Sequence, residues 1–409
     1  MSFVAKIIAG MVAGDLISIW YAHRRLRTTR TPRGWRVALI AFFFVQITGL
    51  TLLLMSRVRN TDTDRVLTKP LLSAVYIWHF LGVPIFLLLA FGERVADGAR
   101  RLTGMIISDD RMIAPGKESA DGAMRRRDFV ALAVTSAPAL LSLAGTAIAL
   151  PQLERFRIRR IELHLPALPP ALEGLTIAHV TDFHVGRFTS GRLLGEIADA
   201  TNRLEADLVL LTGDLINYDL RDLPAGLDIV RALRARHGVF MCEGNHDLIE
   251  NPVRFRSAAR KSGVPFLLNE TLTLNIREVP VQILGLQWGH DKHYSIRAAQ
   301  HGDAAIEASM RDLLPQRDPG AFPILLAHHP HAFDYAHDVP LTLAGHTHGG
   351  QLMLTENMGF GPAMFRYWSG VYRKQDRALV VSNGVGNWFP LRTRAPAEII
   401  HLTLRKAPS

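Results

Sequence analysis

Three long apolar stretches without Asp, Glu, Lys or Arg dominate the first third of the chain. They cover residues 37–55, 71–91 and 129–150, and each has roughly the 20 residues that a helix needs to cross a bilayer. In lipid, a single segment can satisfy all its backbone polar groups only as a helix. The sequence therefore predicts a helical transmembrane region over residues 1–150, and its 409 residues leave room for a separate domain after it.

A fourth stretch, residues 3–20, is interrupted by Lys6 and Asp15. Charged groups inside a membrane span are costly. This stretch is therefore either a fourth span, with Asp15 facing other helices, or a segment lying at the membrane surface. We favour the span, so the region is expected to contain three to four spans.

Basic residues flank the apolar stretches unequally. Segments 23–36 and 93–128 hold much of the excess of Lys and Arg over Asp and Glu that gives the chain its net charge of +10. Segment 57–69 contains residues of both signs. Cytoplasmic loops are enriched in Lys and Arg. This pattern predicts a multi-pass protein of the cell inner membrane, with everything after Leu150 in the periplasm or otherwise extracytoplasmic. Membrane topology accounts for the charge, so no nucleic-acid partner is expected.

The segment from Arg126 to Val130 resembles a twin-arginine export signal. The alternative interpretation is a basic stop before an ordinary span. Both interpretations keep Arg125 to Arg127 in the cytoplasm and lead the following segment outward. The sequence shows no decisive cleavage site.

After Leu150 the long apolar stretches give way to short apolar runs of strand length. Residues 151–174 are expected to form a linker and a first strand, whose Arg155 to Arg160 either contact phospholipid head groups or form a solvated strand face. Strands that are apolar throughout are usually buried on both faces of a sheet, which predicts an α/β domain over 175–409. The further expected strands are 175–180, 208–211, 238–241, 281–284, 324–327, 341–344 and 378–381, and the expected helices are 192–204 and 226–236.

Polar residues that bind metals follow five of these runs directly. Open α/β sheets place their sites at the carboxyl ends of strands, and Asp, Asn and His suit first-row metals. Residues two apart on an extended backbone point the same way, so Asp182 with His184, and His346 with His348, are each expected to reach one metal cluster. The five segments are Asp182-Phe183-His184, Gly213-Asp214, Gly244-Asn245-His246-Asp247, His328-His329-Pro330 and Gly345-His346-Thr347-His348.

In order, the motifs DFH, GDLI, GNHD, LLAHHP and GHTHGGQ resemble those of the calcineurin-like metallophosphoesterases. The resemblance is strongest to the membrane-linked bacterial branch of that family, and it covers about residues 175–402. It implies a metallophosphoesterase β-sandwich flanked by helices in four αββα layers. It also implies two divalent metal ions, Mn, Fe or Zn, at one rim of the sandwich.

The resemblance assigns roles to the motif residues. His246 would face the substrate phosphate without binding metal, and Asp247 would orient His246 from behind. His328 is preferred to His329 as a ligand. The metal ligands would be Asp182, His184 and His348 for one ion, Asn245, His328 and His346 for the other, and Asp214 for both.

These roles imply a metal-dependent phosphoesterase that hydrolyses a phosphoester or phosphodiester by attack of a metal-bridging hydroxide. The membrane location favours a lipid-linked substrate. The alternative is a membrane sensor or scaffold with a vestigial metal site, against which the intact ligand set argues. Cys242 lies in an apolar run and is expected to be a small buried residue. The oligomeric state, the natural substrate and the native metals stay open.

Overall fold

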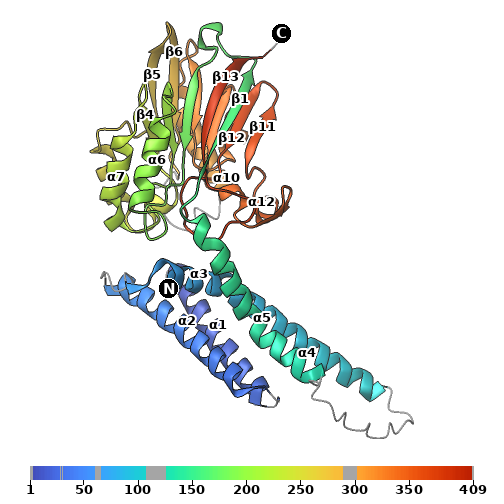
Figure 1. The fold of residues 1–409 in the computed structure, drawn as a ribbon. Helices are drawn as coiled ribbons and strands as arrows, with labels where there is room; N and C mark the ends of the chain where they lie inside the picture. Colours follow the sequence, from blue (N-terminus) through green and yellow to red (C-terminus); the bar gives the residue numbers. More distant parts are fainter. Residues whose placement is uncertain are drawn as a thin grey trace. The chain divides into compact units, whose positions relative to one another are not determined.

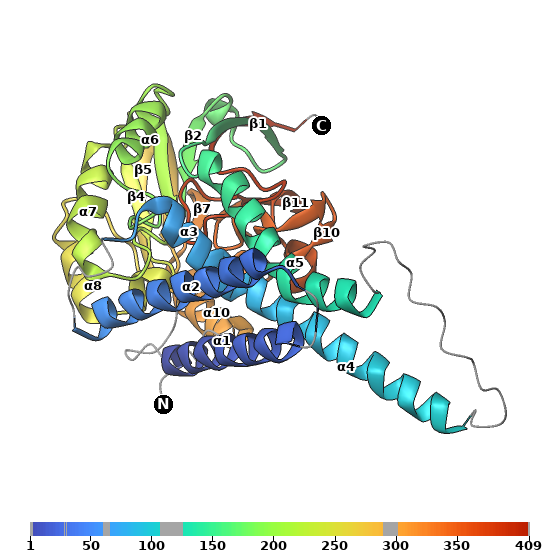
Figure 2. The same cartoon turned by 60° about the horizontal axis from the view of Figure 1, so that its bottom comes forward.

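The computed structural model describes residues 3–27, 29, 31–59, 66–106, 126–288 and 302–407. The chain divides into two compact units, Met1–Leu150 and Pro151–Ser409, which can be followed by colour in Figures 1 and 2. Arg125 and much of the basic segment 93–128 lie outside the described residues, as do residues 60–65 of the mixed segment.

The described part of the N-terminal unit is helical. Three of its segments, Arg33–Ser56, Lys69–Ala99 and Asp128–Gln152, are long and apolar enough to cross a membrane, and they contain the three predicted stretches. The residues of the fourth stretch belong to a helix as well. The elements are α1 (Phe3–Arg27), α2 (Arg33–Arg59), α3 (Lys69–Ile77), the π-helical turn η2 (Trp78–Gly82), α4 (Val83–Ile106) and α5 (Arg126–Ala149).

Asp15 of α1 is buried against the π-helical turn. Its Oδ1 accepts a hydrogen bond from Trp78 Nε1 at 2.8 Å, and its Oδ2 lies 2.9 Å from His79 Nε2. The other ring nitrogen of His79 lies 2.7 Å from the carbonyl oxygen of Val75. Asp15 therefore faces other helices, and every side-chain polar atom of this trio has a partner inside the unit. Helix α1 is not one of the three segments that are long and apolar enough to cross a membrane, so the fourth span stays a prediction.

The C-terminal unit is a sandwich of two sheets, with helices on both outer faces (Figure 1). The first sheet has the strand order β1-β13-β2-β3-β4, and the second has the order β11-β12-β8-β7-β6-β5. The strands are β1 (Arg157–Leu165), β2 (Thr176–Val180), β3 (Leu208–Thr212), β4 (Val239–Cys242), β5 (Glu270–Ile276), β6 (Val279–Gly285), β7 (Phe322–Leu326), β8 (Leu341–Ala344), β11 (Gly370–Lys374), β12 (Arg377–Val381) and β13 (Glu398–Lys406), and a small ribbon pairs β9 (Met353–Thr355) with β10 (Met358–Gly359).

Three apolar layers hold the sandwich together. The layer between the sheets contains residues such as Ile177, Leu210 and Leu343, all fully buried. Helices α6 (Arg192–Asn202), α7 (Leu223–Ala232) and α8 (Pro252–Arg260) contribute to the layer on the first sheet, and α10 (Gly302–Leu313) and α11 (Ala332–Tyr335) to the layer on the second. The predicted αββα order of layers is confirmed.

Strand direction determines where the polar loops meet. Strands β2, β3 and β4 run parallel to one another, as do β6, β7, β8 and β12. Because parallel strands end at the same edge of a sheet, each sheet gathers several carboxyl ends at one rim. The loops that carry the predicted site residues leave from these ends.

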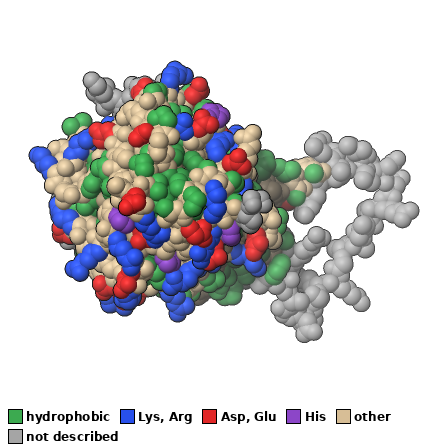
Figure 3. All heavy atoms as spheres, turned by 90° about the horizontal axis from the view of Figure 1, so that it is seen from above, with side chains coloured by type: hydrophobic (Ala, Val, Ile, Leu, Met, Phe, Trp, Pro, Cys, Tyr) green, Lys and Arg blue, Asp and Glu red, His purple; other side chains and the backbone are tan. Residues whose placement is uncertain are grey.

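The surface seen from above in Figure 3 mixes both signs of charge, with Lys and Arg side chains interspersed among Asp and Glu. Cys242, at the end of β4, is buried and has a free thiol. Burial raises the pKa of this thiol well above its ordinary value. The expectation of a small buried residue is therefore confirmed.

Candidate metal centre

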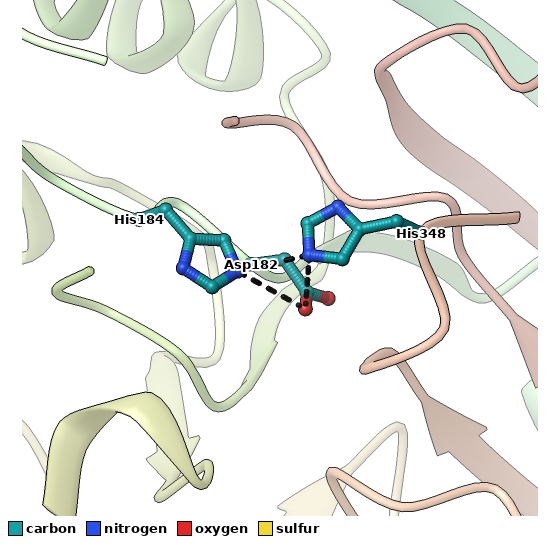
Figure 4. Close-up of side chains that lie close together, drawn as sticks. All are labelled: Asp182, His184 and His348. Carbon is teal, nitrogen blue, oxygen red and sulfur yellow. Dashed lines mark hydrogen bonds and ion pairs between the residues drawn. The ribbon is translucent and has the colours of Figure 1, made fainter. Parts of the chain in front are cut away.

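The first cluster at the rim joins the loop after β2 to the loop after β8. Asp182, His184 and His348 point toward one another (Figure 4). The two Nε2 atoms of His184 and His348 lie 2.9 Å apart. Asp182 Oδ1 lies 3.3 Å from His348 Nε2 and 3.7 Å from His184 Nε2. These three side chains offer one carboxylate oxygen and two ring nitrogens to a common point.

A second cluster lies beside the first and centres on the amide oxygen of Asn245. This oxygen is 3.1 Å from His328 Nε2 and 2.8 Å from His346 Nδ1. Asp214 Oδ2 lies 3.2 Å from His328 Nε2 and 3.4 Å from His184 Nε2, so one carboxylate oxygen contacts both clusters. All seven predicted ligands therefore come together, with Asp214 in the shared position.

The donor set fits divalent cations. His184 Nε2 faces another imidazole nitrogen and two carboxylates. Arg392 Nη2 lies 2.9 Å from His348 Nδ1, and because a guanidinium only donates, that nitrogen accepts. Ring nitrogens and carboxylate oxygens directed at one point are the ligands that first-row metals take.

Burial and neighbouring charges set the protonation of the cluster. Burial lowers the pKa of His346 to about 3 and that of His246 to about 4. Burial alone would raise the pKa of Asp214, but His328 and His246 hold it well below its ordinary value. Metal ligands must be deprotonated, and the predicted ligands His346 and Asp214 are in that form at neutral pH; His246, which is not a predicted ligand, is neutral as well.

His328 behaves differently from the other imidazoles. Its burial opposes protonation, but the Asp214 carboxylate outweighs burial and raises the pKa of His328 to about 9. Without a cation, this imidazole therefore carries a proton beside Asp214. Metal binding at this position would release that proton.

The backbone under the site differs from the sequence prediction. Asp182 and His184 have φ of 54° and 44°, and His346 and His348 have φ of 72° and 49°. These values lie in the left-handed region, so the prediction of extended backbone at the two motifs was wrong. The chain turns sharply as each strand ends, and each such residue costs about 1–3 kcal/mol of strain.

Two motif glycines allow close contacts with the carboxylates. A Cβ at Gly244 would lie 2.1 Å from Asp214 Oδ1, and a Cβ at Gly345 would lie 2.2 Å from Asp182 Oδ2. Any side chain there would displace the carboxylate. Close packing against the predicted ligands therefore requires glycine at these two positions.

The structure separates the two residues that were expected to act in catalysis. His246 Nδ1 is hydrogen-bonded to the carbonyl oxygen of Asn217. The Asp247 carboxylate instead accepts hydrogen bonds from the backbone amides of Ile216 and Gly244, at 3.0 and 2.9 Å. The expected contact of Asp247 with His246 is replaced by Asn217, and Asp247 ties the loops after β3 and β4 together.

His246 lies close enough to the ligands to be considered among them. A nitrogen of His246 lies within 4.8 Å of ligand atoms of His184 and Asp214. Since its Nδ1 is bonded to Asn217, Nε2 is the nitrogen left for a substrate or a cation. That His246 contacts the substrate and does not bind metal stays a prediction.

Arg392 contacts the candidate site, and the sequence did not indicate it. It is 4% exposed, contacts His348 Nδ1 and donates to the carbonyl oxygens of Asn383, Ala395 and Gly386. Arg392 lies outside the five motifs, and a single arginine among loop residues carries no pattern. Its role follows only from the tertiary structure.

Aromatic rings surround the imidazoles. The Trp288 ring lies 5.3 Å from His328 and 5.0 Å from His346, and Trp388 lies 6.2 Å from His246. His329 stacks at 4.9 Å from His346, and the backbone amide of His331 donates to its Nδ1. His328 rather than His329 therefore lies in the second cluster, as the preference between them expected.

Comparisons with known proteins agree with this geometry. Residues 175–350 match the family model described as calcineurin-like phosphoesterase. That range begins just before β2 and includes all seven predicted ligands.

Three relatives illustrate the similarity. An uncharacterized metallophosphoesterase of Helicobacter pylori is 29% identical over 62% of this chain, and the match spans 65% of its own length. A zebrafish (Danio rerio) transmembrane protein with a metallophosphoesterase domain is 26% identical over 83% of this chain and 75% of its own length. The phosphodiesterase YaeI of Escherichia coli is 26% identical over 56% of this chain and 81% of its own length.

Proposed function

The chain belongs to the calcineurin-like phosphoesterase family through residues 175–350, and on this premise we propose that it hydrolyses a phosphoester or phosphodiester with its C-terminal unit. In this proposal the N-terminal unit anchors it in the cell inner membrane as a multi-pass protein, and the catalytic unit lies on the extracytoplasmic side. The residues proposed to bind two metal ions are Asp182, His184, Asp214, Asn245, His328, His346 and His348.

One observation carries the proposal. Asp214 Oδ2 contacts His184 of one cluster and His328 of the other, at 3.4 and 3.2 Å. Adjacent clusters that share a carboxylate suit a pair of cations. A single capping carboxylate or a lone histidine pair would not provide this arrangement.

The residues around the two clusters have separate roles in the proposed hydrolysis. When bound, the two cations supply a nucleophilic water at neutral pH and offset the charge on the phosphoryl group. His246 is held by its Nδ1 on Asn217, which leaves Nε2 to contact the substrate phosphate or to protonate the leaving oxygen. Asn217 and Asp247 act by positioning, because their contacts fix the loops that carry His246 and Asp214.

Hydrolysis of bis-p-nitrophenyl phosphate by the purified full-length chain with added manganese tests the enzyme. The wild type is expected to turn over, and Asp214→Asn and His246→Ala are expected to lose turnover. Matched controls are Asp228→Asn, in an exposed ion pair with Arg231, and His164→Ala on the exposed side of β1. Equal activity in Asp214→Asn would reject the site.

A second measurement separates an enzyme from the sensor or scaffold alternative. Metal analysis of the purified protein is expected to find two divalent ions, Mn, Fe or Zn, per chain. A folded protein that binds no metal and hydrolyses no phosphoester would support the vestigial site instead.

The proposed membrane orientation needs its own test. The three candidate spans support membrane anchoring, and the basic segments support the orientation through the positive-inside rule. Alkaline phosphatase fused after Leu150 is expected to be active, because that enzyme folds only outside the cytoplasm. An inactive fusion would place the C-terminal unit in the cytoplasm. A lipid-linked phosphoester is then the proposed substrate class, tested by comparing lipid and nucleotide phosphoesters.

A further inference from the structure

A pocket of about 370 Å³ opens in the C-terminal unit beside the start of β1, and its charged lining residues are all cationic. It is lined by Gln152, Arg155, Phe156, Arg157, Arg392 and Arg394, together with residues 395–397. Four arginines around one pocket make a strongly positive site for an anion.

Two of these arginines have no acidic partner. Arg155 and Arg394 are exposed, and no carboxylate among the described residues pairs with either of them. Arg157 is different, because it donates to the buried Glu398 carboxylate at 2.6 and 2.9 Å, and Arg159 lies 3.5 Å from the same carboxylate. Glu398 is thus already shared between two arginines, and Arg155 and Arg394 stay available to a ligand.

Arg392 adds a buried positive charge to the pocket wall. Its hydrogen bonds go to carbonyl oxygens, to Asn387 and to His348, and none goes to a carboxylate. Among the described residues Asp182 and Glu398 stabilise this charge from a distance without a hydrogen bond to the guanidinium, so Arg392 adds to the positive wall of the pocket.

The pocket lies where the chain leaves the third candidate span. Gln152 is the last residue of that span and lines the pocket itself. Arg155 follows three residues later, which is at most about 11 Å of extended chain. The polar head-group layer on each side of a bilayer is roughly 5–8 Å thick. An anion at this depth is most simply the phosphate of a lipid head group.

We propose that the pocket between Arg155 and Arg394 binds the phosphate of an anionic phospholipid head group, with Phe156 as its apolar wall. This inference rests on the membrane anchoring in the proposed function, but it does not require hydrolysis. Bound lipid would fix the start of β1 at the membrane surface. The same contact holds the Arg392 segment, whose guanidinium contacts the metal ligand His348.

Native mass spectrometry of the full-length chain in detergent can test the proposal. Phosphatidylglycerol is added to the wild type and to the double variant Arg155→Gln/Arg394→Gln, in EDTA so that no lipid is consumed. Basic residues near a membrane surface each contribute about 1 kcal/mol, so the double variant is expected to bind roughly 10- to 30-fold more weakly. The matched control is Arg203→Gln/Arg234→Gln, which removes the same charge from two exposed arginines outside the pocket.

Further measurements separate the sources of the anion. Zwitterionic phosphatidylcholine is expected to be retained less than phosphatidylglycerol, and excess inorganic phosphate is expected to displace little lipid. Equal binding by the double variant, an equal loss in the control, or full displacement by inorganic phosphate would each overturn the proposal.

Two readouts report separately on the proposed function. Turnover of bis-p-nitrophenyl phosphate by Arg155→Gln/Arg394→Gln is expected to match that of the wild type, because neither residue is among the proposed ligands. Membrane fractionation of the wild type reports on anchoring. Failure of lipid binding alone, with turnover and anchoring intact, therefore rejects only the pocket.

Discussion

Each unit buries an aspartate beside histidine, but the two clusters differ in their balance of donors and acceptors. In the N-terminal unit, Asp15 accepts from Trp78 and contacts His79, whose second nitrogen meets a carbonyl oxygen. In the C-terminal unit, the Nε2 atoms of His184 and His348 face each other at 2.9 Å, with Asp182 and Asp214 close by.

The difference shows what distinguishes a structural cluster from a metal centre. In the first cluster each side-chain polar atom of Asp15, Trp78 and His79 lies within hydrogen-bond distance of a partner in the same unit. The second directs ring nitrogens and carboxylate oxygens of several residues at common points, which is the ligand set that divalent metals take. The second cluster could therefore hold a cation.

Metal addition should separate the two clusters most sharply. At a metal concentration of 1,000 times Kd, ligand binding stabilises a folded state by about 4 kcal/mol. We expect the unfolding midpoint of the C-terminal unit to rise with manganese and to fall with EDTA, as measured by scanning calorimetry.

Two variants sharpen this prediction. Asp214→Asn should abolish the metal-dependent rise, because both clusters lose their shared ligand. Asp15→Asn should leave the rise unchanged. A metal-dependent shift that requires Asp15 would break the comparison.

The next largest expected effect is a dependence of folding stability on pH that arises from the buried His179. His179 of β2 is fully buried, and its Nε2 lies 2.9 Å from Thr212 Oγ1. Burial lowers the pKa of His179 to about 4. Between pH 6.5 and 4 the unfolded chain binds a proton that the folded chain does not, so stability falls as pH falls through this window.

The size of this effect can be measured by difference. The lowered pKa corresponds to at most about 3 kcal/mol at acidic pH. Urea unfolding of the wild type and of His179→Gln at pH 7 and pH 4.5, both in EDTA, is expected to show the smaller pH dependence in the variant. Equal pH dependence in the two proteins would show that His179 is not held neutral.

Arg392 tests whether the metal centre depends on a partner outside its ligand set. Groups that orient a metal-bound histidine typically contribute 10- to 100-fold to metal affinity or activity. We therefore expect Arg392→Met to bind the metal at the Asp182–His184–His348 cluster more weakly and to lose turnover by about that factor.

The readout for Arg392 should include metal content as well as rate. The variant is expected to retain one ion more firmly than the other, with partial rescue by Arg392→Lys. The matched control is Arg234→Met, at an exposed position just after helix α7. Uniform loss of both ions together with unfolding would indicate a purely structural role.

The smallest effect is expected in the N-terminal cluster. Hydrogen bonds between membrane helices average about 0.6 kcal/mol in stability. Asp15→Asn should therefore destabilise the helical unit only slightly in detergent unfolding and leave hydrolysis of a soluble diester unchanged. Loss of hydrolysis without loss of stability would assign a functional role to this cluster.

Local sequence patterns predicted the parts of the fold with strong periodicity. The apolar runs at β2, β3, β4, β7 and β8 are short and nearly uniform, and buried parallel strands have that pattern. The polar residues that end these runs predicted the rim of the site. Motif order then indicated all seven residues that the structure brings together.

The remaining features depend on distant contacts. Strand β5 mixes polar and apolar residues, and its pairing with β6 settles its place. The left-handed backbone of Asp182 and His348 has only a weak local signal: neither is glycine, although Asp and His adopt this conformation more often than most other residues. Arg392 is brought to the site by its contact with His348, which lies 44 positions earlier in the chain.

The pairing of β1 with β13 has a consequence for how the C-terminal unit is made. Strand β13 lies between β1 and β2, and its register with β1 runs from Arg157 opposite Glu398 to Leu165 opposite Lys406. During synthesis more than two hundred residues are therefore added after β1 before β13, its partner strand, has been made. Such distant pairing is slow and leaves a strand edge exposed to aggregation. A chain that ended before β13 could not complete this sheet, because β1 would then have no neighbouring strand in it.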